Sequence, residues 1–156
     1  MRPPSDQLLE LIDRAKQLIY DQFEIQIDVT IPICSVDEMT TKLKNIYATK
    51  APTVYRKIEP LIPFMEGKFF KEDREIWLIE RIGENLATIV HEMLHSIQEC
   101  DSTHREPIVH YLTYKLTGDK TGIYEPLIED WQEIERMYNI KRILKRLISK
   151  GDCEDF

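Results

Sequence analysis

The first part of the chain contains two clear hydrophobic patterns. Apolar side chains recur at helical spacing over residues 6–23 and predict a helix that Ser5 caps. Residues 24–31 alternate strictly between polar and apolar side chains, which is typical of a half-buried strand, and Pro32 is expected to end that strand. The pattern therefore predicts a helix followed by a strand.

The middle of the chain has weaker signals. Residues 35–38 have the Ser-x-x-Glu form of a capping box, which predicts a short helix to about residue 47. Residues 49–66 contain three prolines, so we expect irregular backbone or short edge pieces there. Residues 68–70 and 75–80 flank a polar turn, which predicts a hairpin.

Three helices are expected in the second half of the chain. The first runs over about 85–99, and the second runs from about 103 to Gly118. The third begins at Glu125, where the following proline suits the first turn of a helix. This last helix is acidic early and basic late, an order that complements the helix dipole and is typical of a solvated face; a contact of its basic half with nucleic acid or a partner is the alternative.

Composition narrows the class of protein. A chain of 156 residues with 42% hydrophobic and 31% charged residues is typical of one globular domain, 1–156. The net charge of −7 argues against a general affinity for nucleic acid or anionic membranes. No apolar run approaches the roughly 20 residues of a membrane helix. The odd, widely separated cysteines suit free thiols in a reducing compartment, so we expect a cytoplasmic location; they are Cys34, Cys100 and Cys153.

The candidate chemistry lies in the segment His91-Glu92-Met93-Leu94-His95. Residues four apart lie on one face of a helix, so the imidazoles of His91 and His95 can bind one zinc ion. Glu92 lies about 100° around the helix, where a carboxylate can accept a proton from metal-bound water without ligating the metal. The segment therefore predicts a single catalytic Zn²⁺ with Glu92 as the general base. Ordinary core or surface histidines are the alternative.

A third ligand must come from another element. Glu99 lies on the same helical stripe but is about 12 Å along the axis from His91, which is too far. If the next helix packs antiparallel, Glu106 lies level with His95 and His110 lies level with His91, so both are candidates. The remaining candidates are His104, Glu125 and Glu129. Glu106 also has the spacing of a capping-box partner for a threonine at 103.

These residues resemble the active-site helix of the zincin metallopeptidases. From about 77 to 124, a strand, a helix, a short turn and a second helix with a glutamate follow one another in the zincin order. The run HEMLHSIQ and the later EPIVHYLT resemble the gluzincins, and the short chain is most similar to the minimal single-domain gluzincins. The resemblance covers about a third of the chain.

The resemblance implies an α+β zincin-like fold, with a small twisted sheet whose edge strand packs on the motif helix and with a glutamate-bearing helix after it. It implies a zinc metallopeptidase that cleaves a protein or peptide substrate through a zinc-activated water. It favours Glu106 as the third ligand and His110, where the family usually has an acidic residue, as the group that orients a ligand histidine. Two alternatives remain: a zincin-derived zinc-binding protein without peptidase activity, and a nucleic-acid-associated protease.

Further expectations follow from the same resemblance. The strand over 75–80 is expected to be the edge strand that binds substrate by strand addition, with a purely structural strand as the alternative. Three tyrosines after the motif are candidates to stabilise an oxyanion, and each is as well explained by packing; they are Tyr111, Tyr114 and Tyr124. The acidic tail over 151–156 is a candidate latency segment or a frayed end.

Overall fold

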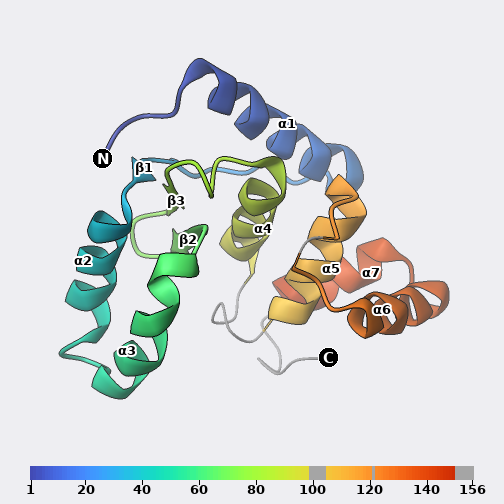
Figure 1. The fold of residues 1–156 in the computed structure, drawn as a ribbon. Coiled ribbons are helices and arrows are strands. Elements are labelled where there is room, and N and C mark those ends of the chain that lie inside the picture. Colours follow the sequence, from blue (N-terminus) through green and yellow to red (C-terminus); the bar gives the residue numbers. More distant parts are fainter. Residues whose placement is uncertain (99–104, 121, 150–156) are drawn as a thin grey trace.

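The computed structural model describes residues 1–98, 105–120 and 122–149. In chain order the elements are α1 (Asp6–Phe23), β1 (Ile33–Cys34), α2 (Val36–Tyr47), α3 (Pro52–Ile58), the 3-10 helix η1 (Glu59–Phe64), β2 (Gly67–Phe70), β3 (Glu75–Ile79), α4 (Leu86–Ile97), α5 (Glu106–Thr117), α6 (Glu125–Met137) and α7 (Ile140–Ile148). They form an α+β fold in which the small sheet lies between α2 and α3 on one side and α4 on the other (Figure 1). Helices α5, α6 and α7 gather beyond α4.

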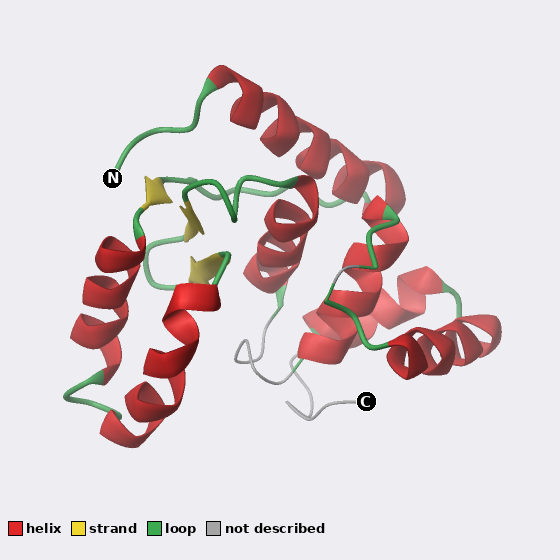
Figure 2. Cartoon of the chain, in the orientation of Figure 1, coloured by secondary structure: helices red, strands yellow, loops and turns green. Residues whose placement is uncertain are grey.

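Helix α1 has the bounds that its apolar stripe predicts. The Ser5 side chain caps it by accepting a hydrogen bond from the Leu8 backbone N–H at 3.2 Å. Its buried face packs against α4 and consists of Leu8, Ile12, Ala15, Ile19 and Phe23. The long α1 runs across the top of the fold in Figure 2, above α4, and its contact with α4 shields this face of the motif helix from water.

The strands of the described residues are ordered β1-β3-β2, with β1 parallel and β2 antiparallel to β3. The predicted hairpin is confirmed, with Phe70 opposite Glu75. The expectation that 75–80 is the edge strand is wrong, because β1 occupies the second side of β3. The strand edge next to α4 belongs to β2 instead.

The predicted strand over 24–31 is also wrong in its bounds. Ile27 and Ile31 are buried, as the alternation predicts, but ladder pairing within this fully described segment is limited to a bridge between Thr30 and Glu75. The strand β1 begins only after Pro32. Because proline has no backbone N–H, it interrupts the ladder, although its carbonyl still accepts a hydrogen bond from Leu78.

Most of the segment 49–66 is helical, over residues 52–64, which corrects the expectation of irregular or edge-strand structure. Pro52 and Pro60 occupy the first turns of α3 and η1, where the missing N–H has no partner to lose. Tyr55 and Ile62 are buried by these turns. With α2 they form a second core on the far side of the sheet, separate from the larger core around α1, α4 and α5.

Helices α4 and α5 pack against each other at the centre of the fold. Asn85 caps α4 by accepting a hydrogen bond from the Thr88 N–H at 2.9 Å, which agrees with the predicted start of this helix at about residue 85. Gly118 ends α5 in the left-handed conformation, with φ 75°. The predicted end of α4 at residue 99 and the predicted start of α5 at residue 103 lie outside the described residues.

The expected single helix from Glu125 onward is two helices, α6 and α7. Asn139 separates them, because its side chain accepts a hydrogen bond from the Arg142 N–H at 3.1 Å and begins a new helix. The acidic and basic halves therefore do not share one helix dipole. Among the described residues, no helix combines the length and the apolar character that a bilayer crossing requires.

Candidate metal centre

Helix α4 presents the motif from a rigid position. Ile89, Val90, Met93 and Leu94 are fully buried around it, in contact with α1, the sheet and α5. The side of α4 between β2 and α5 carries the polar residues of the motif, and His95 and Glu92 remain almost entirely buried there. Tight apolar packing on the other sides leaves these side chains little freedom to move.

Two imidazoles and one carboxylate meet at a single point. The Glu106 Oε1 atom lies 2.7 Å from His95 Nε2 and 3.2 Å from His91 Nε2, and the two Nε2 atoms are 3.1 Å apart. This group could hold a metal ion. This geometry agrees with the sequence prediction, in which a residue on the following helix lies level with the histidines.

Gln98 supports the cluster from the end of α4. Its Oε1 atom lies 2.7 Å from His95 Nδ1, so it accepts the proton of that nitrogen and fixes the ring with Nε2 directed at the cluster. No motif in the sequence singles out this residue. Its position three residues after the second histidine, at the C-cap of α4, is the one signal that suggests such a role.

The carboxylate and the imidazoles of the cluster shift one another's pKa values. Burial raises the pKa of Glu106, but the hydrogen bonds from His91 and His95 outweigh burial and hold that pKa far below its usual range. Burial likewise lowers the pKa of His95, yet its hydrogen bond to Glu106 and the charges of Glu92 and Glu106 leave it raised. The site thus favours a positive charge at the point where the three side chains meet.

His110 lies beside this cluster but is not part of it. Its Nε2 atom is 3.8 Å from Glu106 Oε2, and its ring packs against that of His91 with centroids 4.7 Å apart. Burial and the neighbouring His91 lower the pKa of His110, so it is neutral near pH 7. Glu125 and Glu129 do not belong to the cluster, and His104 and residue 103 lie outside the described residues.

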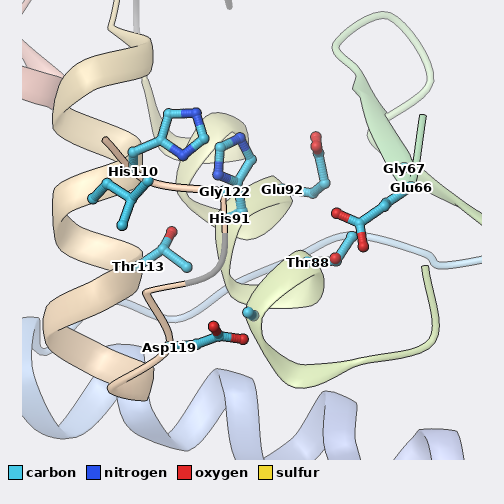
Figure 3. A pocket seen from close by; sticks show the side chains of 11 residues that line it. Glu66, Gly67, Thr88, His91, Glu92, His110, Thr113, Asp119 and Gly122 are labelled. Atoms are coloured by element: carbon cyan, nitrogen blue, oxygen red, sulfur yellow. The ribbon is translucent and has the colours of Figure 1, made fainter. Parts of the chain in front are cut away.

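Glu92 faces two cavities on either side of its carboxylate. Its Oε2 atom accepts a hydrogen bond from the Phe69 backbone N–H of β2 at 2.9 Å. The β2 cavity, about 150 Å³, is lined by Met65, Gly67, Lys68, Phe69, Glu92, His95 and Glu106. The α4–α5 cavity, about 200 Å³, is lined by Glu66, Gly67, Ala87, Thr88, His91, Glu92, His110, Thr113, Asp119, Gly122 and Ile123 (Figure 3).

None of the three candidate tyrosines lines either cavity. Tyr111 is buried, stacks on Trp131 and donates its hydroxyl hydrogen bond to Glu135. Tyr114 contacts Lys120 through its ring, and Tyr124 is largely exposed before α6. The packing interpretation therefore fits Tyr111 best. The acidic tail over 151–156 lies outside the described residues.

The site is thus defined by its own geometry. A helix carries two histidines and a glutamate, a second helix adds the carboxylate that joins the imidazoles, and an edge strand lies against the motif glutamate. Comparison with protein-family models, with curated proteins and with solved structures finds no match for this chain.

Proposed function

We propose that the protein is a zinc-dependent metallopeptidase that hydrolyses peptide bonds in a protein or peptide substrate. The observation that carries this proposal is the meeting of His91, His95 and Glu106 beside Glu92, at the junction of two cavities. The proposed fold is zincin-like, with β2 as the edge strand on α4 and with α5 as the helix that supplies the glutamate.

The donor set suits zinc. Ligand atoms about 2.0–2.1 Å from a tetrahedral ion lie roughly 3.3 Å from one another. The three donor atoms of the cluster are separated by 2.7, 3.1 and 3.2 Å, close to that spacing. Two imidazole nitrogens and one carboxylate oxygen are also the protein ligands of a catalytic zinc with an open fourth position. His91, His95 and Glu106 would therefore hold the ion.

Zinc bound by these residues supplies a Lewis acid, which polarises a carbonyl and lowers the pKa of a coordinated water. Glu92 supplies the proton transfer. The Phe69 N–H holds the carboxylate by donating to its Oε2 atom. The carboxylate would take a proton from the attacking water and deliver it to the leaving amine nitrogen. His95 keeps its orientation through Gln98 while the site works.

The edge of β2 supports a mode of substrate binding. The Phe69 N–H points away from β3, towards Glu92, and backbone groups two residues apart point to the same side of a strand. Gly67 therefore turns its polar backbone groups to the same open edge, next to both cavities. A substrate in extended conformation would pair with this edge at Gly67, because the Phe69 N–H already binds Glu92.

The Glu92→Gln substitution tests the proposal. Removal of the base without removal of a ligand is expected to lower peptide cleavage by about 100-fold to 10,000-fold, while zinc content by elemental analysis stays at that of the parent. Substantial cleavage by this variant would refute the role of Glu92. Zinc in the parent protein with no cleavage above the variant would favour the competing hypothesis, a zinc-binding protein without peptidase activity.

A further inference from the structure

The α4–α5 cavity has a distinct chemical character. Two carboxylates reach towards it from opposite sides, Glu66 from the start of β2 and Asp119 from the loop after α5 (Figure 3). Among the described residues that line it, none is a lysine or an arginine. The Glu66 carboxylate makes no ion pair with any residue of the described ranges. Glu66 therefore adds a negative charge to the rim that no ion pair within the described ranges balances.

The rest of the wall is small or apolar. Gly67, Ala87 and Gly122 leave space between the elements, and Ile123 adds an aliphatic surface. Such a wall suits a long side chain with a methylene stem and a charged end, because the stem packs on apolar atoms while the end reaches the polar rim.

Hydrogen bonds fix the main chain at both residues that carry the carboxylates. The Glu66 carbonyl accepts a hydrogen bond from the Ile79 N–H at 2.9 Å, and a Cβ added at Gly83 would lie only 2.0 Å from that carbonyl oxygen. The Asp119 N–H donates to the Thr117 hydroxyl at 3.2 Å. A fixed backbone lowers the entropy cost of ligand binding.

We propose that the α4–α5 cavity is a specificity pocket that accepts the arginine or lysine side chain of a substrate residue next to the scissile bond. The inference rests on the proposed peptidase function. The position follows from the lining, because His91 and Glu92 belong both to this cavity and to the candidate centre. A side chain in the cavity therefore comes from a residue directly beside the reacting carbonyl.

The specificity pocket should recognise the charge of a substrate side chain and not only its shape. A cationic side chain is attracted by Glu66 and Asp119, and an acidic one is repelled by them and by Glu92. Citrulline has the shape of arginine without its charge, so it should fill the cavity and gain none of this attraction. The preference should also weaken as added salt screens the exposed carboxylates.

Binding of two matched probes to the zinc-loaded protein tests the pocket. Arginine hydroxamate and citrulline hydroxamate share a group that binds zinc and differ in side-chain charge. By calorimetry, the arginine compound is expected to bind on the order of tenfold more tightly. This ratio should fall towards one in Glu66→Gln and in Asp119→Asn, and it should persist in Glu72→Gln, which removes an equal charge from the exposed hairpin turn.

The outcomes distinguish the two proposals. Equal binding of both hydroxamates by the parent protein, or an unchanged ratio in Glu66→Gln, would overturn the specificity pocket and leave the peptidase proposal intact. A protein that takes up no zinc and binds neither hydroxamate would overturn the peptidase proposal and the pocket with it. Cleavage of a peptide library should agree with the binding result through enrichment of arginine or lysine beside the cut bond.

Discussion

At the scale of single residues, Glu106 and His110 lie one turn apart on α5 and face the same centre in different ways. The Glu106 Oε1 atom is within 3.2 Å of both motif imidazoles, whereas His110 reaches only the second carboxylate oxygen, at 3.8 Å. A ligand supplies an electron pair to the ion, and a neighbour only orients that ligand. Loss of the Glu106 side chain should therefore lower zinc affinity by a different factor than loss of the His110 side chain.

Glu106→Ala is expected to lower zinc affinity more strongly than His110→Ala. Removal of an orienting residue typically costs about 10–100-fold in metal affinity, so the loss for His110→Ala should not exceed that range. Competition with a chelator of known affinity measures both variants. If Glu106→Ala binds zinc like the parent while His110→Ala loses it, Glu106 is not the ligand.

Gln98 provides a separate test of orientation. The Gln98→Ala variant removes the acceptor for His95 Nδ1 and is expected to weaken zinc binding by about 10–100-fold. Gln98→Glu retains an acceptor oxygen and should restore most of the affinity, a rescue that loss of packing alone would not produce. Equal zinc affinity in Gln98→Ala and the parent would contradict the orienting role.

At the scale of elements, the position of the site depends on how α4 is held. Helix α1 covers it from one side and α5 from another, so the motif residues are placed by apolar contacts far from any polar group of the centre. Ile19 is fully buried in this contact, while Leu9 of the same helix is 44% exposed. Alanine substitutions at the two residues therefore distinguish the effect of core packing on stability from the effect of a changed helix composition.

Ile19→Ala is expected to lower the free energy of unfolding by about 2–5 kcal/mol, because it removes buried methylenes and leaves a cavity against α4. Leu9→Ala should change stability by less than about 0.5 kcal/mol, as exposed substitutions usually do. Denaturant unfolding of both variants gives the comparison. Similar losses in the two would show that α1 does not pack as described.

At the scale of the whole molecule, a bound ion would join α4 to α5 and so link two helices of the central core. A ligand that binds the folded state alone stabilises it by an amount that grows with the logarithm of the ratio of free ligand to its dissociation constant. Zinc at about one hundred times its dissociation constant adds about 2.7 kcal/mol, which for a chain of this size raises the melting temperature by roughly 5–10 °C.

Removal of zinc by a chelator should reverse that increase. The Glu92→Gln variant should show the same shift as the parent, because its ligands are intact, and His95→Ala should show little or none. Differential scanning calorimetry with and without zinc measures each shift. A shift of equal size in His95→Ala would place the stabilising ion elsewhere.

Local signals in the sequence were sufficient for several elements and for the motif. The stripe and Ser5 predict α1, the capping box predicts α2, and the Asn85 and Gly118 boundaries frame the two central helices. The sequence also predicted that His91 and His95 share one face of a helix and that Glu106 on the next helix lies level with His95. These features depend on contacts within a few residues or on helical periodicity, which the order of amino acids specifies directly.

Tertiary structure alone decided the remaining features. β3 is the central strand because residues 30–34 pair beside it. The sequence of residues 75–80 gives no sign of that pairing. Gln98 reaches His95 only because the chain turns at the end of α4. The acidic α4–α5 cavity joins Glu66 and Asp119, which are far apart in the chain. Such groups meet through long-range packing, and packing depends on the whole fold at once, so local pattern could not locate them.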